Sequence, residues 1–187
     1  KLVAVGSSVL LDAPDITNKN LIEWEFTRGT TAVLILQHYL NLKAPTIYGA
    51  YEGRVLFYPQ NGSLLLQGLQ EADSGVYKAT VDLMENKARK TALEVIEPVP
   101  QPELQYSSNQ AGSPIELFCL VPEGTVDSIS WKKDGRPLPP EKQCLLSLQM
   151  TKLWIRQGEK SDCGSYSCNI SNRLTWKEAT VTLTVTG

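Results

Sequence analysis

Apolar side chains recur at every second position in several short segments of the chain, which is the spacing of a β-strand with one buried face. Two such segments can be aligned, and their apolar members are Val9, Leu11 and Ala13 in one and Ile115, Leu117 and Cys119 in the other. Each is preceded by a glycine and a serine. This alternation predicts strands rather than helices, and it predicts the same strand twice.

A five-residue phrase with the pattern D-x-G-x-Y is also present twice. It reads DSGVY at Asp73–Tyr77 and DCGSY at Asp162–Tyr166. A lone tryptophan between polar neighbours precedes each copy: Trp24 and Trp131 lie 11 and 12 residues beyond the two aligned strands. The chain therefore contains two copies of one structural unit.

A strand, a tryptophan strand and a strand that begins Tyr-x-Cys, in this order, are the signature of the immunoglobulin sandwich. In the second copy, Cys119 and Cys168 take the two positions that bridge the sheets, and Tyr166 is the tyrosine corner. A D-x-G-x-Y phrase alone also fits a generic turn, but here tryptophan and cysteine lie in register with it. The predicted fold class is all-β, with two tandem immunoglobulin-like sandwiches.

The first copy has Ala13 and Ala79 where the second has its bridging cysteines, so it lacks the disulfide between the sheets. Such a loss typically costs about 2–5 kcal/mol. We expect a dense apolar core to compensate, made of Val9, Leu11, Ile22, Trp24, Leu64, Leu66, Leu69 and Val81. We also expect an ion pair between Arg54 and Asp73, which lie 19 residues apart.

Spacing distinguishes the two predicted domains. Ala13 and Ala79 are 66 positions apart, whereas Cys119 and Cys168 are 49 apart. The longer interval leaves room for two extra strands, at 32–40 and 45–51, which are typical of a variable-type domain. We therefore predict a variable-type domain at residues 1–96, a Pro-rich linker at 97–102 and a shorter, constant-like domain at 103–187.

Charge and cysteine usage narrow the function classes. With 18 Lys and Arg against 20 Asp and Glu, the chain lacks the basic surface that nucleic acid or an anionic membrane would need. All four cysteines lie in the second half, which favours two local disulfides in an oxidising compartment. The zinc alternative lacks a C-x-x-C knuckle or Cys/His pairs at finger spacing. We expect a second disulfide between Cys144 and Cys163, with intermolecular pairing as the alternative.

No motif for catalysis or for a cofactor is present. The single histidine, His38, has no nucleophile motif such as G-x-S-x-G around it, and no glycine-rich phosphate loop precedes a predicted helix. We predict no catalytic residue, no metal and no cofactor, and hence no enzyme. Two N-x-S sequons, at Asn61 and Asn169, predict glycosylation on an extracellular surface.

A partner-binding face is predicted on the outer side of the first domain. Where Trp24 and Tyr77 point inward, their strand neighbours must point outward. All four residues at 33–36 are apolar, so alternation does not show which side of this strand is buried. Either Val33 and Ile35 or Leu34 and Leu36 face out. The alternative is that the neighbouring strand covers them. The predicted binding residues are Glu23, Glu25, Leu34, Leu36, His38, Lys78, Thr80, Asp82 and Lys90. Apolar surface rimmed by both signs of charge is typical of a protein-binding face.

The chain resembles the ectodomain of the SLAM family of leukocyte receptors over nearly its whole length. The resemblance rests on the disulfide-free first domain, on the junction EPVPQPEL at 97–104 and on YSCNISNRLTW at Tyr166–Trp176. It implies a type I cell-surface receptor on haematopoietic cells, with its membrane anchor and signalling tail outside this chain. It also implies a protein partner, either a second copy or a related immunoglobulin-superfamily receptor.

Two related groups fit the stretch at 58–77 equally well: the carcinoembryonic-antigen adhesion family, and the hepatic and glial adhesion molecules. These would make the chain an epithelial or glial homophilic adhesion molecule. Two further alternatives stay open. One is a secreted or viral decoy that binds an immune receptor, and the other is an intracellular elastic immunoglobulin module. None of these readings needs a nucleic acid or a small-molecule substrate.

Overall fold

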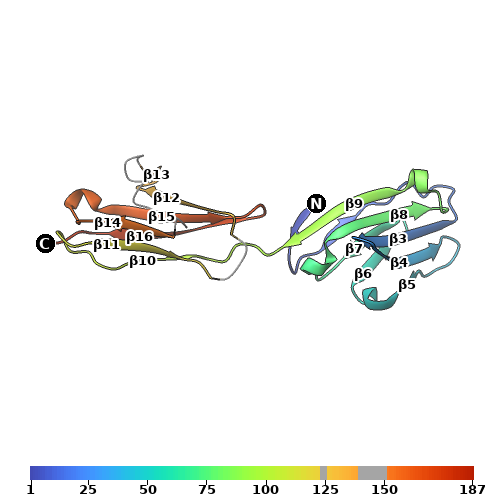
Figure 1. The fold of residues 1–187 in the computed structure, drawn as a ribbon. Helices are drawn as coiled ribbons and strands as arrows, with labels where there is room; N and C mark the ends of the chain where they lie inside the picture. The colour runs from blue at the N-terminus through green and yellow to red at the C-terminus, as the bar shows by residue number, and fades with distance from the viewer. Residues whose placement is uncertain (123–125, 139–150) are drawn as a thin grey trace. The chain divides into compact units, whose positions relative to one another are not determined.

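The computed structural model describes residues 1–122, 126–138 and 151–187, and these fold into β-strands joined by turns (Figure 1). The chain divides into two compact units, Lys1–Glu97 and Pro98–Gly187. Each unit has two sheets, and the described strands pair as in an immunoglobulin sandwich. The predicted all-β class with two tandem sandwiches is therefore confirmed.

The first unit is built from a large front sheet and a small back sheet. The front sheet contains, in spatial order, β1 (Leu2–Ala4), β9 (Arg89–Ile96), β8 (Gly75–Val81), β3 (Leu21–Arg28), β4 (Thr31–Tyr39) and β5 (Thr46–Ile47). The back sheet contains β2 (Val9–Leu11), β7 (Ser63–Leu66) and β6 (Val55–Tyr58). Short 3-10 turns follow at η1 (Gly49–Tyr51), η2 (Glu71–Asp73) and η3 (Glu85–Lys87). The extra strands β4 and β5 make this unit variable-type, although β5 is short and gives way to η1.

The core of the first unit is apolar and has no disulfide. All eight predicted core residues are buried, with exposed fractions of 7% or less. Ala79 lies opposite Trp24 on the neighbouring strand and is fully buried, and Ala13 packs against the same cluster. The Trp24 indole Nε1 donates a hydrogen bond to the Gly62 carbonyl at 2.9 Å, which satisfies the one polar atom of the buried indole.

A β-bulge shapes the middle of the front sheet. Trp24 pairs with Leu36, but the next residue, Glu25, pairs with Leu34, so Ile35 is an extra residue in β4. The bulge interrupts the alternation of β4, and both Ile35 and Leu36 are fully buried. The apolar run that the sequence left ambiguous thus has two consecutive buried members, and Leu34 faces out.

The tyrosine corner and the predicted ion pair are both present in the first unit. The Tyr77 hydroxyl donates to the backbone carbonyl of Asp73 at 2.7 Å, and burial raises the pKa of this phenol well above its ordinary value. Arg54 donates through both terminal nitrogens to the two oxygens of the Asp73 carboxylate, at 3.3 and 2.7 Å. This bidentate contact fastens the start of β6 to the turn before β8.

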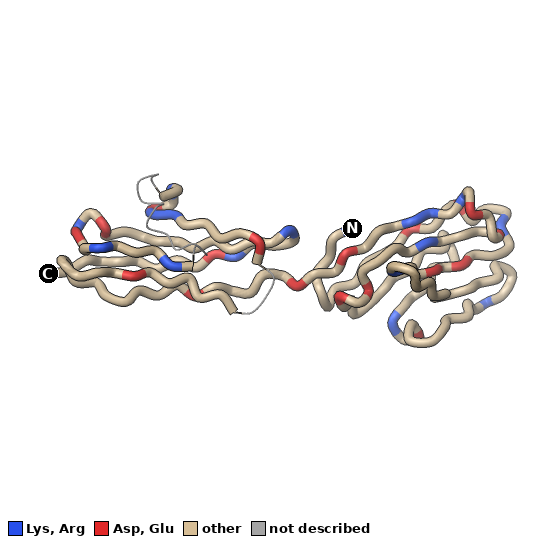
Figure 2. The backbone as a smooth tube through the Cα atoms, viewed as in Figure 1, with Lys and Arg blue, Asp and Glu red and all other residues tan. Residues whose placement is uncertain are grey.

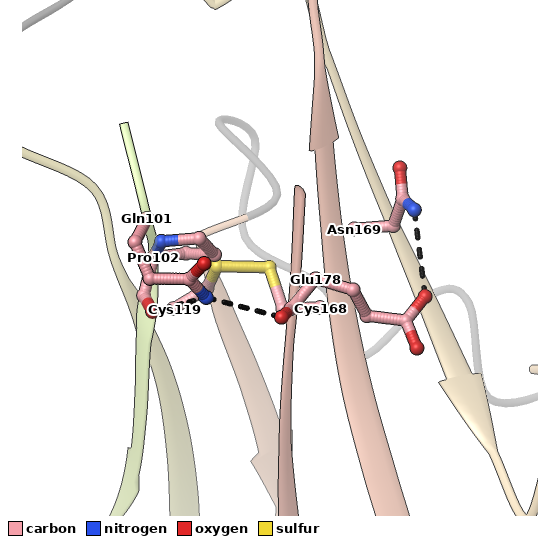
Figure 3. The surroundings of a disulfide bond; sticks show 6 residues. All are labelled: Gln101, Pro102, Cys119, Cys168, Asn169 and Glu178. Atoms are coloured by element: carbon pink, nitrogen blue, oxygen red, sulfur yellow. Dashed lines mark hydrogen bonds between the residues drawn. A yellow bond between two sulfur atoms is a disulfide. The ribbon is translucent and has the colours of Figure 1, made fainter. Parts of the chain in front are cut away.

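The second unit repeats the arrangement with a disulfide. One sheet holds β10 (Glu103–Tyr106), β11 (Ile115–Leu120) and β14 (Lys152–Ile155), and the other holds β13 (Arg136–Pro137), β12 (Ser128–Lys133), β15 (Gly164–Ser171) and β16 (Trp176–Leu183). Cys119 in β11 and Cys168 in β15 form the predicted bridge (Figure 3). Trp131 pairs with Cys168 and is buried, and the Tyr166 hydroxyl donates to the Asp162 carbonyl at 2.7 Å beside η4 (Lys160–Asp162).

Of the other two cysteines, Cys163 lies in the described part of the chain. Cys163 carries a free, half-buried thiol that packs against the core. Its Sγ accepts a hydrogen bond from the Val185 amide at 3.1 Å. Cys144 lies outside the described residues, so the predicted second disulfide stays a prediction.

Candidate partner-binding face

The outward side of the front sheet collects side chains from four neighbouring strands. We call this set the front face; it comprises Glu23 and Glu25 on β3, Leu34 and Gln37 on β4, Lys78 on β8 and Lys90 on β9. These residues face outward because their strand neighbours Trp24, Tyr77 and Ala79 are fully buried. The alternation of β3 and β8, which the sequence already showed, therefore positions most of the face.

A basic residue at the centre of the front face is held by two acids. The Lys78 Nζ lies 3.0 Å from a Glu85 carboxylate oxygen and 3.6 Å from a Glu25 oxygen. The hydrogen bond to Glu85 is the largest cause of the raised pKa of Lys78, and the Glu25 charge adds to it. The ammonium is consequently charged and fixed in place at neutral pH.

Lys90 lies directly beside Lys78 on the adjacent strand, and its side chain is exposed. Like charges opposite one another in a sheet repel, and here the two acids around Lys78 offset this repulsion. Lys90 forms no ion pair within residues 1–122, 126–138 and 151–187. The front face therefore offers a paired Glu25–Lys78 couple next to a cation that is available to an incoming carboxylate.

A chain of polar contacts crosses the other half of the face. The Tyr48 hydroxyl donates to Gln37 Oε1 at 3.3 Å, and Gln37 Nε2 donates to Glu23 Oε1 at 3.3 Å. Leu34, half-buried opposite Glu25 on the side away from Lys78, supplies apolar surface on the same strand as Gln37. The face thus combines charge, amide and apolar contact within one flat sheet.

Two predicted binding residues are wrong because they are buried. Leu36 is fully buried since the bulge at Ile35 turns it inward. His38 is 2% exposed: it pairs with inward-facing Ile22, its Nε2 hydrogen-bonds the Leu42 carbonyl at 3.0 Å, and its ring meets Phe57 edge-on. Neither side chain can contact a partner without local unfolding.

Two more predicted residues are displaced from the binding role. Thr80 lies on the outward side beside Glu23 but is only 7% exposed, so it contributes little surface. Asp82 lies just beyond the end of β8 with a positive φ of 48°, and its carboxylate accepts the backbone amides of Asn20 and Leu21. Asp82 therefore holds a turn in place.

Sequence reasoning missed three contributors: Gln37, Tyr48 and Glu85. Gln37 could have been identified by its polar character between two buried neighbours. Tyr48 and Glu85 lie in the segments after β5 and β8, and no periodic signal shows where such segments fold back. Only the three-dimensional arrangement brings Glu85 to Lys78.

The two sequons lie away from the front face. Asn61 is exposed in the turn between β6 and β7 of the back sheet, and its Oδ1 accepts the Ser63 amide at 3.0 Å. Asn169 lies in β15 of the second unit, and its Nδ2 donates to Glu178 Oε2 at 3.4 Å. Glycosylation at both positions stays a prediction, and neither glycan would originate on the front face.

Acidic and basic positions are interspersed along the first unit (Figure 2). Within the described ranges, no group of three or more His, Cys, Asp or Glu is placed to hold a metal ion. None of the described helical segments is long and apolar enough to cross a membrane.

Comparison with known proteins agrees with this geometry. Residues 100–185 match the family model described as the immunoglobulin I-set domain. In structure, the chain is similar to murine CEACAM1b, with a TM-score of 0.71, 26% identity and coverage of 99% of this chain and 94% of the other. The chain belongs to the immunoglobulin superfamily.

Several of its relatives in sequence are named as adhesion molecules. The hepatic and glial cell adhesion molecule of Mus musculus is 30% identical over 179 residues, which is 91% of this chain and 42% of the relative. A murine receptor solved in complex with a mouse coronavirus receptor-binding domain has a TM-score of 0.73 and 26% identity. Neither of these proteins is named as an enzyme.

A viral protein is also similar. "Uncharacterized protein ORF9" of Fowl adenovirus A serotype 1 is 41% identical over 81 residues, which is 43% of this chain and 25% of the viral protein. The chain thus spans between a quarter and about two fifths of the curated relatives described here. The narrower resemblance to the SLAM family stays a prediction.

Proposed function

We propose that this chain is the recognition part of a cell-surface adhesion receptor and that it binds a protein partner through the front face. The partner is a second copy of the chain or a related immunoglobulin-superfamily receptor. A membrane anchor and a signalling tail outside this chain, acting in immune cells, are part of the proposal. The adhesion molecules among the relatives support it.

One observation carries the proposal: a preformed face on which Lys78 is fixed between Glu25 and Glu85, while Lys90 beside it forms no ion pair with any described residue. A face that presents both an acidic and a basic position can complement itself across a two-fold axis. Because single contacts of this kind are weak and exposed, adhesion would depend on many copies acting together across a cell contact.

The test is a charge reversal on the front face. Beads coated with the wild-type chain should cluster, and sedimentation over a concentration series should show reversible dimers. Glu25→Lys and Lys90→Glu should each weaken self-association by about tenfold, as expected when one interfacial charge contact of about 1.4 kcal/mol is lost. Glu103→Lys in the second unit makes the same charge change at a residue that is not part of the front face, and it should leave clustering unchanged.

Each variant is checked for folding by its thermal midpoint. If the folded Glu25→Lys, Lys90→Glu and Leu34→Glu variants all cluster as the wild type does, the front face is not the homophilic interface. Clustering only with beads that carry a related receptor would select the heterophilic form of the proposal.

A second candidate is a virus-encoded decoy that occupies an immune receptor, and the similarity to the adenoviral protein favours it. The soluble chain would then block adhesion between cells that carry the host receptor. An open reading frame that continues into a membrane-spanning segment would argue against a decoy, and one that ends without it would support a decoy.

A further inference from the structure

Small side chains lie beside Asn169 on the outward side of the larger sheet in the second unit. In the register of this sheet, Asn169 lies between Ser130 on β12 and Glu178 on β16. Its neighbours along β15 are Ser167 and Ser171, whose side chains face the same way because Cys168 and Ile170 are buried. Ser167 is only 8% exposed and its hydroxyl is bonded to that of Thr180 at 3.0 Å, so the accessible hydroxyls beside Asn169 are those of Ser130 and Ser171.

An exposed tryptophan lies on the same side of this sheet as Asn169. Trp176 opens β16 directly opposite Ser171, so it is a diagonal neighbour of Asn169 on the same side of the sheet. Diagonal neighbours lie about 7–8 Å apart, which is within reach of an aromatic ring. Trp176 is 66% exposed, whereas Trp24 and Trp131 are 0% and 5% exposed in the two cores. The Trp176 indole is therefore a large apolar surface that no described residue covers.

A site for attachment of a glycan lies beside Trp176. Asn169-Ile-Ser171 is an N-glycosylation sequon. The Asn169 side chain meets Glu178 on the opposite side of the strands from the disulfide (Figure 3). The bond to Glu178 uses one of the two hydrogens on Nδ2. The second hydrogen has no acceptor among the described residues, so the sugar can replace it.

We propose that Asn169 carries an N-linked glycan whose first N-acetylglucosamine packs on the Trp176 indole and hydrogen-bonds to the hydroxyls of Ser130 and Ser171. In the transfer, Nδ2 forms a bond to the anomeric carbon of a lipid-linked oligosaccharide diphosphate. The bond from that carbon to the diphosphate oxygen breaks, and one amide hydrogen leaves as a proton. Glu178 accepts the remaining N–H and fixes the direction of the linkage.

The side chains around Trp176 match a sugar better than a protein partner. A pyranose ring presents C–H groups on its faces, which pack on an indole, and hydroxyls at its rim, which can pair with Ser130 and Ser171. A protein anchored by Trp176 would instead require apolar surface around the ring, and the neighbours of the ring across and along the sheet are Ser171 and Glu178.

Tryptophan fluorescence tests the contact directly. The protein is secreted from a eukaryotic host that attaches high-mannose glycans, in a background of Asn61→Gln and Trp154→Phe. Trp154 is 44% exposed, so removing it leaves Trp176 as the one exposed tryptophan of the four in the chain. Ser171→Ala in the same background abolishes the sequon, retains Asn169 and serves as the matched unglycosylated control.

The expected result has three parts. Mass spectrometry finds glycan on Asn169, acrylamide quenching of Trp176 falls by about half relative to Ser171→Ala, and trimming with endoglycosidase H to one N-acetylglucosamine preserves this protection. An unoccupied Asn169 overturns the proposal. So does equal quenching with and without the glycan, since the sugar would then extend into solvent without touching the ring. Protection that disappears on trimming to a single sugar overturns the assignment to the first residue of the glycan.

Discussion

The indole of Trp24 and the backbone of Gly62 are joined across the core of the first unit by a hydrogen bond of 2.9 Å. The corresponding tryptophan of the second unit is Trp131, which pairs with Cys168 of the disulfide. The buried carbonyl of Gly62 has a partner because the turn at Asn61–Ser63 passes directly over the tryptophan strand. In the absence of a disulfide, packing, this buried hydrogen bond and the Arg54–Asp73 ion pair therefore hold the two sheets of the first unit together.

Replacing Gly62 by alanine should destabilise the first unit strongly. Gly62 has a φ of +79°, and an added Cβ would lie 2.7 Å from Ile22 Cδ1 and 3.1 Å from the Ala13 Cβ. We expect a loss of about 2–4 kcal/mol in the free energy of unfolding, from positive-φ strain together with overpacking. Gly53→Ala is the matched control, since Gly53 has a φ of +80° with open space around it. Equal losses in urea unfolding would mean that the contact with Ile22 is unimportant.

Removing the disulfide should affect the second unit alone. Cys119 and Cys168 close a loop of 49 residues, and the chain-entropy model assigns such a loop about 4 kcal/mol. In the Cys119→Ala, Cys168→Ala double variant, amide hydrogen exchange in the second unit should accelerate, while exchange at β3 and β8 of the first unit stays unchanged. Accelerated exchange in both units would show that they unfold together.

The ion pair between Arg54 and Asp73 should contribute more than an exposed one. The Asp73 side chain is only 10% exposed. Arg54→Met would leave the Asp73 carboxylate without its bidentate partner. We expect Arg54→Met to lower the free energy of unfolding by about 1–3 kcal/mol. Arg89→Met, which breaks an exposed contact with Asp12 at 3.7 Å, should cost less than about 1 kcal/mol. Similar thermal midpoints for the two variants would contradict this ranking.

Stability should fall in alkaline solution because of the two tyrosine corners. Burial raises the pKa of Tyr77 and of Tyr166, so above a pH of about 10 the unfolded chain loses these protons while the folded chain retains them. Their stabilising contribution is complete below that pH and declines as the pH rises. The thermal midpoint should therefore drop between about pH 9.5 and 11, and it should drop less steeply in Tyr77→Phe. An unchanged slope in that variant would exclude Tyr77 as a cause.

Much of the candidate face could be predicted from the sequence, because strand alternation is a local property. Once Trp24 and Tyr77 are assigned inward, Glu25 and Lys78 must face outward, and the structure places them in contact. The same rule failed for Leu36, since a single inserted residue reverses every later side chain in a strand. It failed for Asp82 as well, because the alternation stops where β8 ends.

By itself, the sequence determined that this protein is two immunoglobulin sandwiches, one bridged by cystine and one not. The repeated tryptophan, the D-x-G-x-Y corners and the cysteine positions are short-range patterns that need no knowledge of the partner strand. Tertiary structure alone decided which side chains reach the surface of the front sheet. The bulge at Ile35, the burial of His38 against Phe57 and the return of Glu85 to Lys78 depend on how segments distant in sequence pair. Such pairing is set by packing over the whole unit, and no local pattern records it.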